Sequence, residues 1–128
     1  MGNAMAKCAI LADRHHGLSE GVRSLLRTMF ETVVMVADEP SLLESASRLE
    51  PALVVADLSL GRKGGLAWVS RLRAGSPGVR VILISVHDEP GVARAASSAG
   101  ADGFVLKRAI ASELLPAVEA VLAGRPYP

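Results

Sequence analysis

Several charged or hydroxyl side chains, of the kinds that can do chemistry in a protein site, each stand at the end of an apolar run: Asp13, Asp57, Ser85 and Lys107. Unbroken apolar runs are typical of strands covered on both faces, as in a parallel sheet. Since ligands gather at the carboxyl ends of such strands, we expect these four side chains to converge. A lone aspartate after a strand more often caps the next loop, so their joint placement favours a chemical site.

The elements that must position these residues alternate along the whole chain. Strands are predicted at Lys7–Ala12, Thr32–Ala37, Leu53–Asp57, Val79–Val86 and Phe104–Leu106. Helices are predicted to begin at Ser19, at Ser41 (where Ser41 and Glu44 match a capping box), at Leu66, at Pro90 and at Ala109. The alternation predicts an α/β fold whose five-stranded parallel sheet has the order 2-1-3-4-5.

Length and charge limit the function. The 128 residues suit one domain, and a net charge of +1 gives no electrostatic footprint for nucleic acid, so we expect no nucleic acid binding by this fragment. The single cysteine, Cys8, and the lack of an apolar run of ~18–20 residues indicate a cytoplasmic protein without a membrane role. We expect a leader or cloning remnant over residues 1–6, a domain over 7–124 and the start of a linker over 125–128.

Five segments together are similar to one known family: Leu11–His15, Glu20–Arg23, Val55–Ser59, Leu83–Asp88 and Ala99–Lys107. They resemble the receiver domain of bacterial two-component response regulators, most closely the NarL/FixJ (LuxR-type) group. The resemblance implies a flavodoxin-like (βα)5 receiver fold and a signalling domain, with at most self-catalysed phosphoryl acceptance and hydrolysis in place of enzyme activity. It also implies a sensor histidine kinase, a C-terminal helix-turn-helix DNA-binding domain beyond this sequence, and pairing with a second copy as a homodimer.

The resemblance also implies roles for single residues. Asp57 matches the phosphoacceptor and Lys107 the lysine that pairs with it, while Ser85 and Phe104 match the hydroxyl and the aromatic residue of the conformational switch. Mg²⁺ would be bound by Asp13, Asp57 and the backbone carbonyl of Ser59. His15 stands where this group commonly has a histidine, so a metal role for it is discounted.

Arg14 departs from the family pattern, because receivers normally have a second acid at this place. The formal charges of Asp13, Asp57, Arg14 and Lys107 therefore cancel, and a charge pair at ~5 Å in an effective dielectric of ~20 is worth roughly 3 kcal/mol. Mg²⁺ binding is in doubt for this reason. Gly61 is a smaller departure, since it stands where proline is usual.

Three functional hypotheses follow. The chain is a receiver phosphorylated on Asp57, or an atypical receiver that acts as a phosphorylation-independent protein-interaction module. In the atypical case, Arg14 pairs with Asp57 and takes the place of Mg²⁺. An unrelated enzyme of similar fold is disfavoured, because no second acid lies two residues after Asp57 and no glycine-rich fingerprint follows the first strand.

Overall fold

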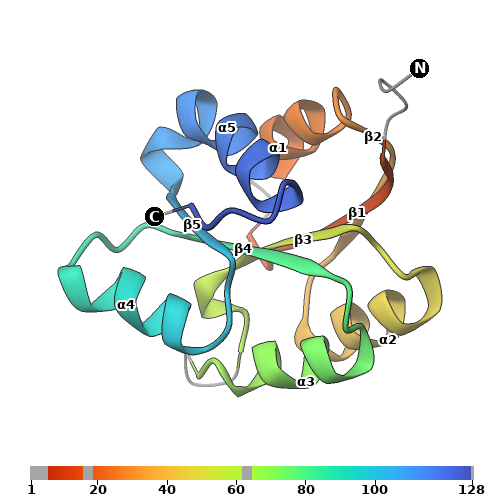
Figure 1. The fold of residues 1–128 in the computed structure, drawn as a ribbon, viewed down its shortest axis with the longest axis horizontal. Coiled ribbons are helices and arrows are strands. Elements are labelled where there is room, and N and C mark those ends of the chain that lie inside the picture. Colours follow the sequence, from red (N-terminus) through yellow and green to blue (C-terminus); the bar gives the residue numbers. More distant parts are fainter. Residues whose placement is uncertain (1–5, 16–18, 62–64, 128) are drawn as a thin grey trace.

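The computed structural model describes residues 6–15, 19–61 and 65–127. They form a five-stranded parallel sheet in the order β2-β1-β3-β4-β5, which confirms the predicted α/β fold and strand order (Figure 1). The strands are β1 (Ala6–Ala12), β2 (Phe30–Val36), β3 (Leu53–Asp57), β4 (Arg80–Ser85) and β5 (Gly103–Leu106). The connections diverge between β1 and β3, and ligands bind at this switch point in open α/β sheets.

The central strands are apolar because helices cover both faces of the sheet. All residues of β3 are buried, as are those of β4 after Arg80. Asp57 at the end of β3 is in register with Ile84, so the carboxyl ends of β3 and β4 lie side by side. The sheet thereby fixes the relative positions of the polar residues that follow these strands.

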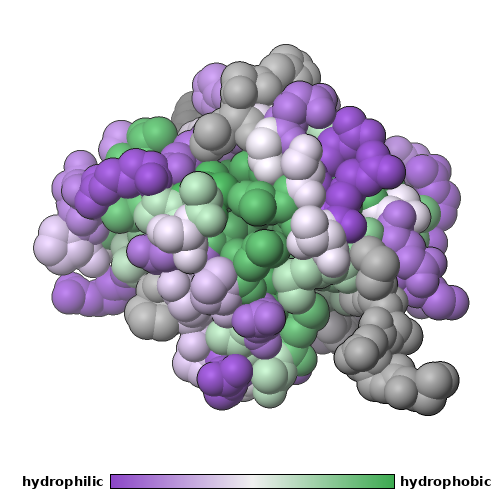
Figure 2. Space-filling view, turned by 90° about the horizontal axis from the view of Figure 1, so that it is seen from above, coloured by the Kyte–Doolittle hydropathy of each residue, from purple (hydrophilic) through white to green (hydrophobic). Residues whose placement is uncertain are grey.

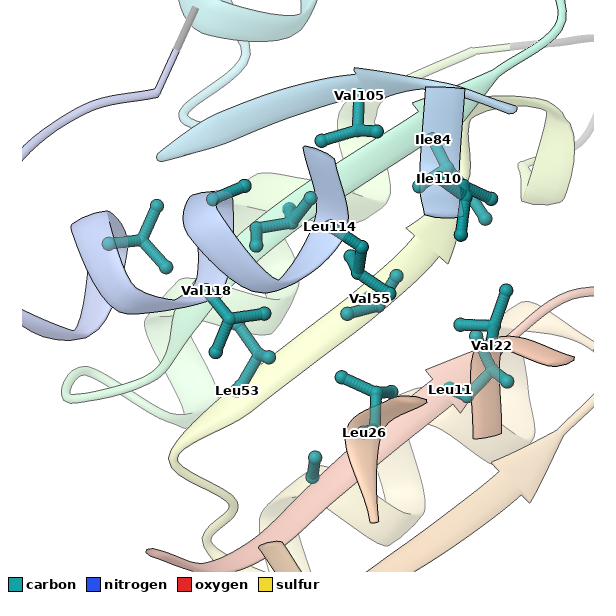
Figure 3. Packing of buried hydrophobic residues seen from close by; sticks show 14 of the residues in the cluster. Leu11, Val22, Leu26, Leu53, Val55, Ile84, Val105, Ile110, Leu114 and Val118 are labelled. Carbon is teal, nitrogen blue, oxygen red and sulfur yellow. The ribbon is translucent and has the colours of Figure 1, made fainter. Parts of the chain in front are cut away.

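Two helical layers enclose the sheet. The helices α1 (Ser19–Leu26) and α5 (Ile110–Leu122) lie on one face, and α2 (Glu39–Leu49), α3 (Ala67–Gly75) and α4 (Pro90–Ser98) lie on the other (Figure 1). On the first face, Leu114 and Val118 of α5 pack over Leu53 and Val55 of β3 (Figure 3). On the second, the largest buried side chains are Trp68, Ile10, Leu42, Leu60, Leu72 and Leu83.

The helix α4 is the least anchored of these helices. Ala96 is its only buried residue. It ends before Gly100, whose φ of 109° is one that L side chains rarely adopt, in agreement with the predicted cap. Few buried apolar contacts make an element easier to displace.

Several element boundaries differ from the prediction by one or two residues. The strand β2 begins at Phe30, earlier than the predicted Thr32, and α2 begins at Glu39, earlier than Ser41. The predicted capping box is wrong, because the carboxylate of Asp38 accepts the backbone N–H of Ser41 at 2.8 Å and caps the helix.

The face that carries α1 and α5 has an apolar area in its middle, with hydrophilic side chains on either side (Figure 2). Partly buried apolar residues pack against the core cluster of this side, among them Leu25, Met29, Val33 and Met35. In residues 6–15, 19–61 and 65–127, no helix is long and apolar enough to cross a membrane.

Candidate functional site

The four polar residues predicted to converge lie at the carboxyl edge of the sheet. Asp13 follows β1, Asp57 ends β3, Ser85 ends β4 and Lys107 follows β5 as the first residue of the 3-10 turn η3 (Lys107–Ala109). A cavity of about 490 Å³ opens here, lined by His15, Asp57, Leu58, Ser59, Ser85, Val86, His87 and Lys107. The topology alone explains this placement, because every strand runs in the same direction.

A network of charges and hydrogen bonds holds the two buried aspartates, each only 5% exposed. The ammonium of Lys107 forms an ion pair with Asp57 and lies 3.3 Å from Asp13 Oδ2. The other oxygen of Asp57 accepts the backbone N–H and the hydroxyl of Ser59, at 2.7 and 2.6 Å. Buried carboxylates need such partners, since burial disfavours an unpaired charge.

These contacts determine the ionisation of Asp57 and Lys107. Burial acts to raise the pKa of Asp57, but the hydrogen bonds from Lys107 and Ser59 outweigh it and hold that pKa below its ordinary value. Burial acts to lower the pKa of Lys107, but the hydrogen bond to Asp57 and the charges of Asp57 and Asp13 raise it overall. Near neutral pH, Asp57 is therefore a carboxylate and Lys107 an ammonium.

Arg14 does not make the contact proposed for it in the atypical hypothesis. Its Nη2 donates a hydrogen bond to the backbone carbonyl of Leu60 at 2.8 Å, and the ion pair of Asp57 is with Lys107. Leu60 ends the 3-10 turn η1 (Leu58–Leu60), which follows directly on Asp57. The guanidinium thus bonds to a neutral acceptor, and the carboxylate of Asp57 is bound by Lys107 and Ser59.

His15 contributes a nitrogen to the pocket that the sequence interpretation discounted. The backbone N–H of His15 donates to Asp13 Oδ1 at 2.8 Å, and its Nδ1 lies 3.5 Å from the same oxygen. One ligand atom each from Asp13, His15 and Asp57 lie within 4.8 Å of one another, close enough to share a metal ion. The signal in the sequence was the position of His15 two residues after an aspartate at a strand end.

Ser85 and Phe104 occupy neighbouring strands. Ser85 is 1% exposed, and its hydroxyl accepts the backbone N–H of His87 at 2.9 Å. Phe104 is half-buried and packs against the cluster on the α2–α4 side of the sheet. Ser85 of β4 is in register with Leu106 of β5, and Phe104 lies two residues before Leu106 on the same strand. Ser85 and Phe104 are therefore two positions apart along the β4–β5 ladder.

The sequence pattern of the response regulator receiver domain matches residues 9–119. The chain belongs to this family. The chain is 37% identical over 112 residues to the transcriptional activator protein ExaE of Pseudomonas putida, an alignment that covers 88% of the chain and 50% of ExaE. It is 30% identical over 127 residues to the nitrate/nitrite response regulator protein NarL of Escherichia coli, with 97% of the chain and 58% of NarL covered.

Solved structures agree with this assignment. A LuxR-family two-component response regulator from an Aurantimonas species superposes with a TM-score of 0.87 at 31% identity, covering 98% of this receiver and 90% of that chain. This receiver spans about half the length of the curated relatives that it matches. It is therefore a NarL/LuxR-type receiver domain by sequence and by fold.

Proposed function

We propose that this receiver accepts a phosphoryl group on Asp57 and controls a transcriptional output domain. The observation that carries the proposal is the buried, ionised carboxylate at the end of β3 with the ammonium of Lys107 beside it, in a cavity of about 490 Å³. An exposed surface aspartate would have neither the enclosure nor the cation. This pairing favours phosphoryl chemistry over a role in packing.

The chemistry is an in-line displacement at phosphorus. An oxygen of Asp57 attacks the phosphorus of a phosphohistidine or a small acyl phosphate, the bond to the donor breaks, and the donor leaves with the electron pair. Negative charge spreads over the phosphoryl oxygens in the transition state, so a fixed cation stabilises it. Lys107 lies where its ammonium, already paired with Asp57, can shift to those oxygens, and Ser85 supplies a hydroxyl from the next strand.

The donor set also fits a divalent cation, as receiver domains generally bind Mg²⁺ through an acidic pocket. Asp13 and Asp57 would hold it, with the backbone carbonyl of Ser59 as an expected third oxygen ligand. Bound there, the cation supplies positive charge that neutralises the phosphoryl oxygens. The possible ligand group also includes the imidazole of His15, and this makes the set less oxygen-rich than Mg²⁺ prefers.

The partners follow from the same assignment. The relatives are transcriptional regulators about twice as long as this chain, which supports a DNA-binding output domain in the whole protein and a histidine kinase as phosphodonor. Pairing with a second copy and a cytoplasmic location remain predictions. The net charge of +1 still argues that the receiver itself does not bind DNA.

Acetyl phosphate labelling tests the assignment of Asp57. The receiver is incubated with acetyl phosphate and Mg²⁺ or Mn²⁺, and intact mass spectrometry counts the phosphoryl groups. We expect one group on the unmodified chain, none on Asp57→Asn, and an unchanged yield on the control Glu119→Gln, which removes an exposed carboxylate of α5. Equal labelling of the unmodified chain and Asp57→Asn would refute Asp57 as the acceptor.

The same assay distinguishes a phosphorylated receiver from the atypical, phosphorylation-independent one. Arg14→Asp restores the second acid, and we expect it to label faster than the unmodified receiver because it strengthens cation binding. The contact of Arg14 with Leu60 supports slow labelling over none, since Asp57 is not blocked by the guanidinium. If only Arg14→Asp is labelled, the unmodified domain acts without phosphorylation, as an interaction module.

A further inference from the structure

Two residues that depart from the family pattern, Arg14 and Gly61, meet at the turn that follows Asp57. The Nη2 of Arg14 donates to the carbonyl of Leu60, the last residue of η1, at 2.8 Å, and Gly61 comes next in the chain. Ser59 of the same turn holds the carboxylate of Asp57, because its backbone N–H and its hydroxyl both donate to Oδ1, at 2.7 and 2.6 Å. Arg14 is therefore linked to the proposed phosphoacceptor through two neighbouring residues of one turn.

Arg14 extends from a firmly held part of the chain. Asp13, just before it, is 5% exposed, and its backbone N–H donates to the carbonyl of Val36 in β2 at 3.0 Å. His15, just after it, donates its backbone N–H to Asp13 Oδ1 at 2.8 Å. The guanidinium thus joins the end of β1 to the end of η1, and these segments follow neighbouring strands of the sheet.

The turn continues into a glycine, which restrains it little. A Cβ added to Gly61 would lie 2.7 Å from Trp68 Cδ1 and 2.2 Å from the carbonyl oxygen of Gly65, so the proline that is usual in the family has no room here. Glycine leaves the backbone far more freedom than proline does. The hydrogen bond from Arg14 acts on the carbonyl directly before this glycine, where the turn is least restrained by its own sequence.

We propose that Arg14 is a positioning residue for phosphoryl acceptance, which holds η1 in the conformation in which Ser59 fixes the carboxylate of Asp57. The buried side chain of Leu60 fixes where the turn ends, and the bond from Arg14 fixes the orientation of its last carbonyl. Two donors on Oδ1 restrain rotation of the carboxylate, so Oδ2 stays beside the ammonium of Lys107. This inference rests on the proposed function of Asp57.

The effect of this positioning falls on the chemical step. With acetyl phosphate as donor, Asp57 Oδ2 forms a bond to phosphorus, the bond from phosphorus to the acetate oxygen breaks, and acetate leaves with the electron pair. Such a displacement needs the attacking oxygen within a narrow range of positions. A loosened turn therefore lowers the rate of transfer from bound donor more than it weakens donor binding.

Amide hydrogen exchange at Ser59, measured by NMR on the metal-free chain, reports how firmly the turn is held. We expect exchange about fivefold faster in Arg14→Ala, because one hydrogen bond to the turn is lost. Hydroxide catalyses exchange, so the loss of a positive charge alone would slow it. Arg108→Ala is the matched control, since it removes the same charge next to Lys107 but bonds to Asp88, and it should leave Ser59 exchange unchanged.

Labelling with acetyl phosphate then tests the positioning role, at a divalent cation concentration that saturates each variant. This condition separates positioning from cation binding, which the change of charge also alters. We expect the maximal labelling rate of Arg14→Ala to be about fivefold lower, with nearly the same half-saturating concentration of acetyl phosphate. Arg14→Lys keeps a charged donor on a long side chain and should recover most of the rate.

Four results would overturn the proposal. Equal Ser59 exchange in the unmodified chain and in Arg14→Ala would show that the bond to Leu60 does not hold the turn. Faster exchange with equal maximal labelling rates would make Arg14 a structural residue only, and Arg14→Lys as slow as Arg14→Ala would show that the donor is not what matters. If the unmodified chain were not labelled at all, the proposed function of Asp57 would fail and the positioning role with it, whereas Ser59 exchange would still report the hold on the turn.

Discussion

At the scale of single residues, His15 adds a nitrogen to the two carboxylates of the possible ligand group. Its Nδ1 lies 3.5 Å from Asp13 Oδ1, and one of its nitrogens lies within 4.8 Å of both buried carboxylates, which share the ammonium of Lys107. Mg²⁺ prefers oxygen ligands in octahedral geometry, whereas imidazole suits later transition metals and is accepted by Mn²⁺. The pocket should therefore favour Mg²⁺ over Mn²⁺ less strongly than a site made only of oxygen ligands would.

We predict that His15→Ala weakens Mn²⁺ binding about tenfold while it leaves Mg²⁺ binding nearly unchanged. Fluorescence of Trp68, the only tryptophan, or calorimetry would measure both affinities. His87→Ala is the matched control, because His87 lines the same cavity but is not in the ligand set. An equal loss for the two ions, or an equal effect of His87→Ala, would contradict a ligand role for His15.

The sequence predicts the placement of these residues better than their contacts. Asp13, Asp57, Ser85 and Lys107 were placed correctly, because a strand end fixes where a short side chain lies in a parallel sheet. The contact of Arg14 with Asp57, which the atypical hypothesis proposed, is not formed, because the guanidinium bonds to Leu60 instead. A side chain of that length has several acceptors within reach, and the carbonyl of Leu60 could not be identified before the turn after β3 was known.

At the scale of elements, the start of α2 depends on one exposed carboxylate. The backbone N–H of Ser41 bonds to Asp38 and holds the pKa of that carboxyl below its ordinary value of 3.8. The folded state thus favours the ionised cap. Its stabilisation is fully present above the ordinary pKa and is lost as the pH falls through the lower, folded-state pKa.

We therefore predict that Asp38→Ala lowers the melting temperature by a few degrees at neutral pH, whereas Asp38→Asn, which keeps an acceptor, lowers it less. The gap between the unmodified chain and Asp38→Ala should stay constant down to the ordinary pKa and shrink at lower pH. Thermal unfolding followed by circular dichroism across pH would measure this. A gap that widens in acid would show that the charge of Asp38 does not stabilise the helix.

Element types were predictable from the sequence, and several boundaries were not. The apolar runs identified every strand because the sheet is covered on both faces. The capping box at Ser41 and Glu44 was a plausible local pattern, but Asp38 competes for the same N–H groups and starts the helix two residues earlier. The sequence therefore contains two candidate caps for this helix, Asp38 and Ser41, and the structure uses Asp38.

At the scale of the whole molecule, one sheet carries two cores. Side chains of β3 alternate between them, with Leu53 and Val55 in the cluster under α1 and α5, and Val54 and Ala56 in the cluster under α2–α4. Neither core can exist without the strands of the other. The pairing of Tyr127 with β5 has no signal in the sequence, since Gly-Arg-Pro-Tyr-Pro is typical of a linker.

Because both cores depend on the same strands, we predict that the domain unfolds in a single transition whichever core is weakened. Leu114→Ala in the α5 cluster and Leu42→Ala in the α2 cluster each remove a fully buried side chain and should cost about 2–5 kcal/mol. The two residues lie on opposite faces of the sheet, so the double variant should show the sum of the two losses to within about 0.5 kcal/mol. Leu122→Ala, at a position 36% exposed, is the control and should cost far less.

Urea unfolding followed in parallel by far-ultraviolet circular dichroism and by the fluorescence of Trp68 would test this prediction. Trp68 lies in the α2–α4 core, so its fluorescence reports that side of the sheet, whereas circular dichroism reports all helices. Coincident curves in Leu114→Ala are expected, because loss of the α1–α5 core removes β3 and β4 from beneath Trp68 as well. A Trp68 transition that stays at the unmodified midpoint while the circular dichroism transition shifts would show that the two faces unfold separately.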